Sequence, residues 1–133
     1  MDRLVIPSNI YNKMLEHCRN HLPDEACGIL AGSGNEVSKI YTMTNIEPSP
    51  SSYLMEPKEQ FVAMKDMRGR NLSMAAIFHS HPSSPAFPSG RDINLAFYDN
   101  AVHIIVGLSE TTPSVRAYFI RDGKAEEACI VIK

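Results

Sequence analysis

Residues 73–92 read SMAAIFHSHPSSPAFPSGRD, and this stretch indicates both the fold and a candidate site. The run at 75–78 is apolar on both faces, which predicts a buried strand over residues 73–80. Three prolines and two serines fall within residues 82–88, a composition typical of an irregular loop. Ser89 then has the position of a helix N-cap. The stretch therefore predicts a strand, a loop and a helix in succession.

Outward from this unit, the periodicity of apolar residues predicts three helices and six or seven strands. The helices are expected from Pro7 to just before Pro23, from Pro57 to near Gly69, and from Ser89 onward. The remaining strands are expected at residues 4–6, 25–34, 36–45, 102–108, 115–121 and 125–132, with a turn at Asp122-Gly123. This mixed order predicts an α/β or α+β fold, with one curved mixed sheet flanked by about three helices in a single domain of residues 1–133.

The helical patterns also predict which side chains face the core. Phe61 and Met64 are expected on the inner face of the second helix. Ile93, Ala96 and Phe97 are expected on the inner face of the third helix.

Composition and charge exclude several classes of protein. The 133 residues are 44% hydrophobic and 21% charged, which excludes a disordered tail or a disulfide miniprotein. Thirteen Lys and Arg against fifteen Asp and Glu give a net charge of −2, which argues against a nucleic-acid partner. No apolar run approaches the roughly 20 residues that span a bilayer, and the first residues lack a signal-peptide pattern, so no membrane partner is expected. Three cysteines, an odd number, argue against a disulfide framework and favour the cytoplasm.

The residues that carry chemistry are His79, His81 and Asp92. Alternate residues of a strand face the same side, so both imidazoles are expected to converge at the end of the strand. Asp92 follows eleven residues after His81, in the first turn of the expected third helix. Two histidines and one carboxylate are a sufficient ligand set for tetrahedral zinc with its fourth position open, as catalysis requires.

A simpler interpretation of the same residues stays open at this point. A His-x-His pair arises easily by chance in a chain with five histidines. Ser89 and Asp92 also have the spacing of a helix capping box, in which each side chain accepts a hydrogen bond from the backbone N–H of the other residue. A histidine pair at a strand end, followed by an acid in the first turn of a capped helix, nevertheless favours a metal site.

The HSH pattern at residues 79–81, followed after seven residues by Ser89 and after two more by Asp92, resembles the signature of the JAMM (MPN-plus) metalloproteases. The segment 25–28, Glu-Ala-Cys-Gly, resembles the part of that family that bears a catalytic glutamate. The resemblance covers nearly the whole chain and is to the minimal bacterial and archaeal members, which lack the insertions of the larger eukaryotic deubiquitinases. It implies a single MPN/JAMM domain of cytidine-deaminase-like architecture.

Carried over to this sequence, the resemblance implies that His79, His81 and Asp92 bind one zinc ion per chain. It also implies that Glu25 is the general base and that Ser89 is the polar group beside the developing oxyanion. Zinc lowers the pKa of a coordinated water to roughly 7, so that Glu25 can take its proton and later pass it to the leaving amine. More than fifty residues separate Glu25 from the histidines, so its role rests on the resemblance alone.

The resemblance implies the reaction as well. A zinc-dependent metallopeptidase of this kind hydrolyses the peptide or isopeptide bond after the C-terminal Gly-Gly of a ubiquitin-like or sulfur-carrier protein. The released group is a cysteine, a C-terminal extension or a conjugated lysine, and the sequence does not separate these three. Two alternatives stay open: a non-catalytic MPN scaffold, and a RadC-like protein linked to DNA, which the length and charge of the chain disfavour.

Four other residues receive structural interpretations. Cys27 lies in an apolar strand and is expected to be a buried small hydrophobe rather than a nucleophile. His103 is expected to be a core or edge histidine. His17 and His21 lie four residues apart on the first helix and are expected at the surface, because no carboxylate follows at ligand spacing.

Overall fold

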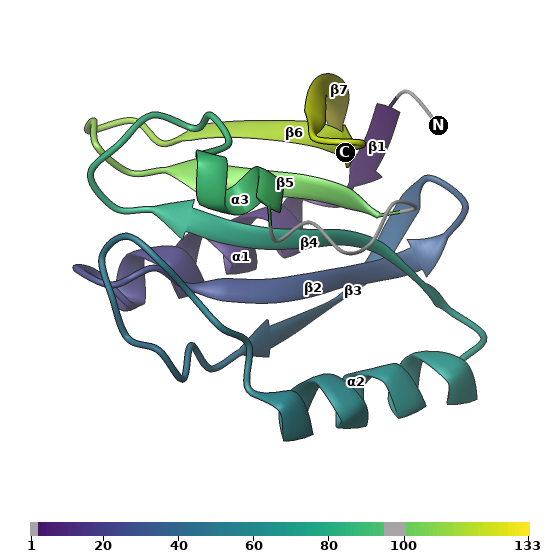
Figure 1. The fold of residues 1–133 in the computed structure, drawn as a ribbon. Coiled ribbons are helices and arrows are strands. Elements are labelled where there is room, and N and C mark those ends of the chain that lie inside the picture. Colours follow the sequence, from purple (N-terminus) through teal and green to yellow (C-terminus); the bar gives the residue numbers. More distant parts are fainter. Residues whose placement is uncertain (1–2, 95–100) are drawn as a thin grey trace.

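A computed structural model describes residues 3–94 and 101–133, and the seven strands in this part of the chain close into a barrel (Figure 1). The strands are β1 (Arg3–Ile6), β2 (Cys27–Ser33), β3 (Glu36–Met43), β4 (Ser73–His81), β5 (Val102–Gly107), β6 (Ser114–Arg121) and β7 (Lys124–Ile132). Their order around the barrel is β1-β3-β2-β4-β5-β6-β7, and β1 closes the ring by pairing in parallel with β7. The predicted curved mixed sheet is confirmed, and its curvature is complete enough to close.

Three helices lie in the described residues: α1 (Ser8–Asn20), α2 (Pro57–Gly69) and α3 (Gly90–Asn94). In the view of Figure 1, α1 lies behind the sheet and α2 below it. Ile10, Met14 and Cys18 of α1 belong to one core cluster, whereas Ala63 and Met67 of α2 belong to another. The sheet is therefore covered by apolar side chains on two sides.

Strand β4 lies at the centre of this arrangement. It pairs antiparallel with β2 and parallel with β5, and its residues from Ala75 to His81 are all buried. Burial on both faces explains why its sequence is a continuous apolar run rather than an alternating one. The strand ends at His81, where the chain leaves the sheet for the proline-rich loop.

The turns between neighbouring strands form where the sequence predicts them. β2 and β3 form an antiparallel hairpin, and Gly34 between them has a φ of +60°. β6 and β7 form another hairpin, in which Asp122 and Gly123 both have positive φ. Positive φ at both central residues produces the turn that matches the twist of paired strands, and Asp-Gly is well suited to it.

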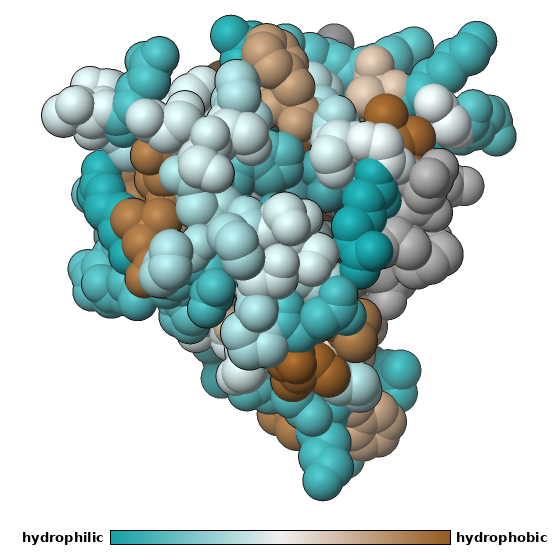
Figure 2. All heavy atoms as spheres, turned by 60° about the vertical axis from the view of Figure 1, so that its left-hand side comes forward, coloured by the Kyte–Doolittle hydropathy of each residue, from teal (hydrophilic) through white to brown (hydrophobic). Residues whose placement is uncertain are grey.

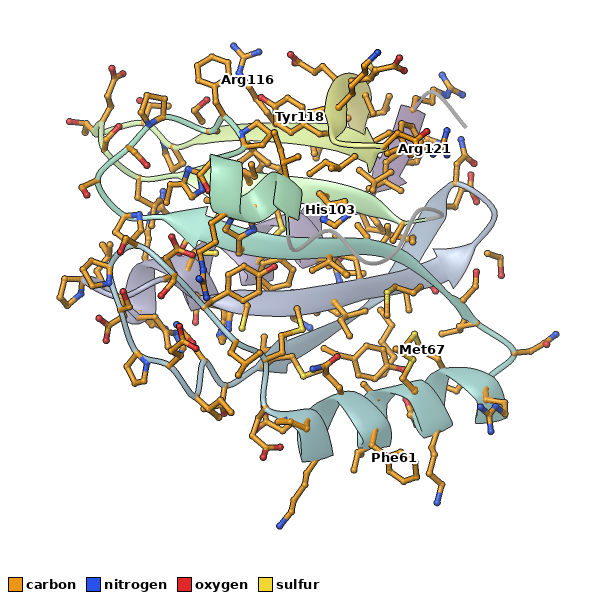
Figure 3. The ribbon with its side chains drawn as sticks, in the orientation of Figure 1. Phe61, Met67, His103, Arg116, Tyr118 and Arg121 are labelled. Atoms are coloured by element: carbon orange, nitrogen blue, oxygen red, sulfur yellow. The ribbon has the colours of Figure 1, made fainter. Side chains whose placement is uncertain are left out.

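The buried face of α2 differs from the prediction. The helix begins and ends where expected, but Phe61 is 65% exposed and points away from the sheet in Figure 3. Ala63 and Met67, one turn apart, form the buried stripe, and Met64 is half-buried beside it. The inner face of α2 therefore centres on Ala63 and Met67 rather than on the bulkier Phe61.

The third helix is short within the described residues. Ile93 packs against the cluster formed by Ala86, Ile105, Tyr118 and Ile120, so its predicted inward position is confirmed. Ala96 and Phe97 lie outside the described residues. None of the helices in the described part of the chain has the length and apolar character needed to cross a membrane.

Gly28 provides a test of the packing between β2 and β4. A Cβ built on Gly28 would overlap the ring of Phe78 and lie 2.7 Å from the Tyr41 carbonyl oxygen. We expect Gly28→Ala to lower the free energy of unfolding by about 1–3 kcal/mol, because the fully buried Phe78 ring has little room to shift. Denaturant unfolding measures this, with Gly69→Ala as the control because a Cβ there meets nothing within 4 Å. Equal stability of the two variants would contradict the packing.

Candidate metal centre

Two histidines at the end of β4 and a carboxylate from α3 meet at one point. His79 and His81 are buried, and their Nε2 atoms lie 3.2 Å apart. Asp92, in the first turn of α3, places one oxygen 3.1 Å from His79 Nε2 and the other 3.0 Å from His81 Nε2. The structure thus brings together the three side chains that the sequence pattern predicts, and they are called the His–His–Asp group below.

Asp92 also takes part in a helix cap. Its backbone N–H donates to Ser89 Oγ at 3.0 Å, and the backbone N–H of Ser89 donates to Asp92 Oδ2 at 2.9 Å. These reciprocal bonds form a capping box. The cap and the histidine contacts coexist because a carboxylate has two oxygens with several lone pairs. Since the exposed Ser89 hydroxyl accepts the bond from Asp92, its own hydrogen remains for a further acceptor.

The spacing of the donor atoms fits a metal ion. Four ligands at about 2.0–2.1 Å from a tetrahedral zinc lie roughly 3.3 Å from one another. The two Nε2 atoms lie 3.2 Å apart, each has one Asp92 oxygen at 3.0–3.1 Å, and one donor atom from each of the three residues lies within 4.8 Å of the others. His81 Nδ1 lies 2.9 Å from the Pro85 carbonyl oxygen, which only accepts, so this nitrogen carries the hydrogen. Loss of the proton that Nε2 donates to Asp92 would leave a lone pair on Nε2 facing the other two side chains, and a cation in place of that proton would interact with all three.

The electrostatics of the group also favour a cation. Burial by itself would raise the pKa of Asp92, but hydrogen bonds from His79 and His81 outweigh it and hold that pKa well below its usual range. Burial by itself would lower the pKa of His81, yet hydrogen bonds to Asp92 and to the Pro85 carbonyl raise it overall. Asp92 is therefore ionised at neutral pH and offers the negative charge that a buried cation needs.

Strand pairing brings Glu25 to the same place. Just before β2, Ala26 pairs with Ser80: the Ser80 N–H donates to the Ala26 carbonyl, and the Ala26 N–H donates to the Ser80 hydroxyl. The register of β2 and β4 begins with the pair Cys27 and His79. Extended two residues beyond β2, it puts Glu25 opposite His81, whose charge acts on the Glu25 carboxyl. Residues directly opposite each other in such a pair face the same side of the sheet. The Glu25 side chain therefore lies on the face that carries the histidines.

The Glu25 carboxyl has the environment of a proton acceptor. The residue is only 4% exposed, and its Oε1 has no hydrogen-bond partner among the described residues. Burial raises the pKa of this carboxyl to about 7, while the charges of His81 and Arg91 oppose the rise. A carboxyl with a pKa near neutrality can accept and release a proton within one reaction cycle. By local pattern alone Glu25 is a solvated edge residue, and its burial contradicts that interpretation.

Asn45 holds the Glu25 backbone in place, a role that the sequence does not indicate. The residue is 8% exposed. Its Nδ2 donates to the carbonyls of Glu25 and Ser52, and its Oδ1 accepts from the N–H groups of Glu47 and Leu54. One side chain thus closes a loop and attaches it to the chain just before β2. An asparagine in a loop rich in Ser and Pro is an ordinary turn residue by composition, so no local signal distinguishes it.

A cavity of about 170 Å³ opens beside the His–His–Asp group. Its wall is mostly apolar. The lining includes Leu54, Met55, Ile77, Ile105, Ile120, Ser52, Gln60, Arg91 and His103. The Tyr53 ring, which also lines it, stacks on His79 with the ring centroids 4.7 Å apart and the planes at 24°. This stacking orients the His79 ring, whose Nδ1 has no hydrogen-bond partner within the described residues.

The remaining candidates have structural roles. Cys27 is fully buried, and burial raises the pKa of its thiol to about 12, so its interpretation as a small hydrophobe is confirmed. His103 is buried as expected and lies on β5 beside α3 in Figure 3. The surface position predicted for His17 is wrong, because the residue is half-buried and its Nε2 donates to the Cys27 carbonyl at 3.1 Å. His21 is also half-buried, and its Nδ1 donates to the His17 carbonyl at 2.8 Å.

Comparison with known proteins assigns a family to this geometry. Residues 7–121 match the family described as prokaryotic homologs of the JAB domain. The chain belongs to this family. The resemblance to JAMM (MPN-plus) proteins that the sequence motif indicates is therefore confirmed.

Two relatives named as peptidases match over most of their length. The chain is 35% identical over 127 residues to the CysO-cysteine peptidase of Mycobacterium tuberculosis, covering 93% of this chain and 87% of the relative. It is 35% identical over 130 residues to a probable TtuB-protein conjugate cleaving protease of Thermus thermophilus, covering 97% of this chain and 83% of the relative. This level of identity indicates that the prokaryotic JAB-family chain is a JAMM-type peptidase.

The fold of this chain also matches that of a solved structure. The solution structure of a protein from Desulfitobacterium hafniense superposes with a TM-score of 0.89 at 36% identity, covering 98% of this chain and 92% of that one. The barrel and its helices are thus shared with that protein over nearly the whole chain.

Asn45→Asp tests the attachment of the loop that contains it. The substitution keeps both acceptor bonds but replaces the donor amide with an oxygen that faces the carbonyls of Glu25 and Ser52. We expect the free energy of unfolding at pH 7 to fall by about 1–3 kcal/mol, because buried carbonyls lose their donor. Denaturant unfolding measures the change, and Asn12→Asp at an exposed position of α1 is the control. Unchanged stability of Asn45→Asp would show that the amide is not the anchor.

Proposed function

We propose that this chain is a zinc-dependent metallopeptidase that hydrolyses the peptide or isopeptide bond after the C-terminal Gly-Gly of a ubiquitin-like or sulfur-carrier protein. The observation that carries the proposal is the convergence of the His–His–Asp group with the buried carboxyl of Glu25. Three protein ligands leave one position of a tetrahedral ion open to the reacting groups, and the buried Glu25 carboxyl would move protons there.

The donor set favours zinc over other ions. Two imidazole nitrogens and one carboxylate are typical ligands of catalytic zinc, whereas calcium and magnesium prefer oxygen ligands. His79 and His81 would hold one ion per chain through their Nε2 atoms, and Asp92 would hold it through a carboxylate oxygen. When bound, zinc acts as a Lewis acid that polarises the scissile carbonyl and makes water acidic near neutral pH.

Glu25 would transfer the protons of the reaction. Its carboxylate takes a proton from the attacking water and delivers it to the leaving nitrogen as the C–N bond breaks. Both transfers need a group whose protonated and ionised forms have similar free energy, and burial supports this by raising the pKa of Glu25 to about 7. The bond from Asn45 Nδ2 to the Glu25 carbonyl and the bond from the Ser80 N–H to the Ala26 carbonyl support a fixed position for the carboxyl.

Ser89 would donate a hydrogen bond to the carbonyl oxygen as that oxygen gains negative charge. The Ser89 hydroxyl accepts from the Asp92 N–H, which orients it and leaves its hydrogen for donation. A donor of this kind stabilises the transition state more than the ground state, because the charge develops during the reaction.

The names of the relatives and the burial of the site support the substrate class. One relative is named for CysO-cysteine and another for conjugates of TtuB protein. His79 and His81 are only 2% and 5% exposed, so a substrate has to reach them through a narrow opening. A Gly-Gly tail suits such an opening, because an extended backbone without side chains is the slimmest form of a polypeptide.

The proposal treats residues 1–133 as one catalytic domain that acts in the cytoplasm. Cys18 and Cys27 are buried free thiols, as is usual for a reducing compartment. In the alternative roles of a scaffold or a RadC-like protein, the buried carboxyl of Glu25 has no evident use.

Zinc content tests the ligand assignment. Protein stripped with a chelator and reloaded is expected to hold about one zinc per chain by elemental analysis. His79→Ala and Asp92→Asn should each lose most of this zinc, because two remaining ligands bind the ion weakly. Glu25→Gln should keep it, and His21→Ala, just after the end of α1, serves as the histidine control. Full zinc occupancy in both ligand variants would refute the assignment.

Intact-mass spectrometry tests the reaction. Zinc-loaded protein is mixed with CysO, TtuB and ubiquitin, each extended past its Gly-Gly, and we expect one of them to lose the mass of the extension. Glu25→Gln should bind zinc without cleaving, because the amide accepts no proton at neutral pH. Ser89→Ala should cleave roughly 100- to 1,000-fold more slowly. If no carrier is cleaved by fully zinc-loaded protein, the scaffold alternative gains support.

A further inference from the structure

Arg91 brings a positive charge to the cavity beside the His–His–Asp group. It precedes Asp92 in α3, and its side chain lines the cavity together with His79. Its charge acts on Glu25, since it is one of the groups that oppose the rise in the pKa of that carboxyl. The steps proposed for the reaction make no use of this guanidinium.

An ion pair joins Arg91 to the loop on the other side of the cavity. Arg91 Nη2 donates to Glu47 Oε1 at 3.2 Å, and the two side chains are 49% and 50% exposed. An ion pair so accessible to water contributes little stability. This contact engages one of the five N–H donors of the guanidinium. A second carboxylate can therefore join or replace Glu47 at small cost.

The remainder of the cavity suits a small residue. Leu54, Ile77, Ile105 and Ile120 contribute apolar wall, while Arg91 and Ser52 contribute polar groups. An apolar cavity of about 150 Å³ in another protein holds a benzene molecule, so the cavity of about 170 Å³ has room for a small side chain. Figure 2 shows the side of the molecule at the left of Figure 1, toward which β4 runs; its surface is mostly hydrophilic with separate apolar patches. A charged group at the end of a bound chain is thus compatible with this mostly hydrophilic surface.

We propose that Arg91 selects the leaving group, by binding the α-carboxylate of a single amino acid attached to the last glycine of the carrier protein. This inference rests on the proposed peptidase function and narrows its three leaving groups to one, a free C-terminal residue. A guanidinium is well suited to this role, because its planar fork binds both oxygens of a carboxylate.

Hydrolysis of such a substrate needs no reactant other than water. Water adds to the carbonyl carbon of the last glycine, and the C–N bond breaks. The glycine keeps the water oxygen as a carboxylate, and the nitrogen leaves as the ammonium group of a free amino acid. The carboxylate of that amino acid is two bonds from the leaving nitrogen, within reach of a cation that lines the adjoining cavity. A lysine side chain has only methylene groups at this position, so it offers Arg91 no partner.

The ion pair predicts opposite effects for its two members. In the free protein Glu47 forms an ion pair with the Arg91 guanidinium, so it competes with the carboxylate of the substrate for that group. Removal of the negative charge at Glu47 should therefore strengthen substrate binding, whereas removal of the positive charge at Arg91 should weaken it.

The test uses the carrier that mass spectrometry identifies, extended past Gly-Gly by one alanine with either a free carboxylate or a carboxamide. We expect zinc-loaded wild-type protein to cleave the carboxylate form with a kcat/KM roughly 10- to 100-fold higher, because the carboxamide lacks the charge-assisted bond. Arg91→Gln should remove this difference by slowing the carboxylate form alone. Glu47→Gln should lower KM for the carboxylate form and leave the carboxamide form unchanged.

A matched control and a binding measurement separate recognition from indirect effects. Arg70→Gln on α2 removes an exposed arginine that pairs with Asp66 at 2.9 Å, and it should keep the preference for the carboxylate form. Zinc content of Arg91→Gln should equal that of wild type, which excludes an effect through Asp92. Calorimetry with zinc-loaded Glu25→Gln should find tighter binding of the carboxylate form, and adding Arg91→Gln should abolish the difference.

Two results would overturn the assignment while leaving the peptidase function intact. One is equal kcat/KM for the two substrates in wild-type protein. The other is equal slowing of both substrates by Arg91→Gln. Failure of the wild-type protein to cleave any extended carrier would instead refute the proposed function, and this inference with it.

Discussion

The antiparallel pairing of β2 with β4 is the constraint on which the rest of the structure depends. Extended two residues beyond its first pair, Cys27 and His79, its register puts Glu25 opposite His81. A slip of one residue would turn Glu25 to the other face of the sheet, because side chains alternate along a strand. Ser80 secures the register at this end: its backbone N–H and its hydroxyl both bond Ala26, and it is fully buried. Rigid strands thus set the distance between the Glu25 carboxyl and the His–His–Asp group.

Two loops complete the site that these strands begin. The loop after β4 ends in the cap between Ser89 and Asp92, so the bonds that start α3 also aim the carboxylate at the histidines. The loop before α2 is closed by Asn45, and it carries both the ring that stacks on His79 and the acid that pairs with Arg91. A few polar side chains hold each loop on the barrel. The surroundings of the His–His–Asp group can therefore change through these loops without disturbing the sheet.

Local patterns were sufficient for most elements of the fold and insufficient for their contacts. The apolar run of β4, the Asp-Gly turn before β7 and the proline that opens α2 each act through neighbouring residues, and these elements form where predicted. The predicted inward position of Phe61 on α2 was wrong, and so was the predicted surface position of His17. In both cases the periodicity of one helix does not reveal where the neighbouring sheet lies or how closely it approaches.

By itself, the sequence determined the strand, loop and helix that bring the His–His–Asp group together. All three residues lie within positions 79–92, and strand alternation and the helix cap set their directions locally. Only the tertiary structure decided the surroundings of that group. Glu25 is more than fifty residues from the group in sequence and comes near it through strand pairing. Asn45 closes its loop through hydrogen bonds that the composition of the loop does not predict. The physical reason is that local patterns report which face of an element is apolar, whereas pairing between distant segments decides what that face meets.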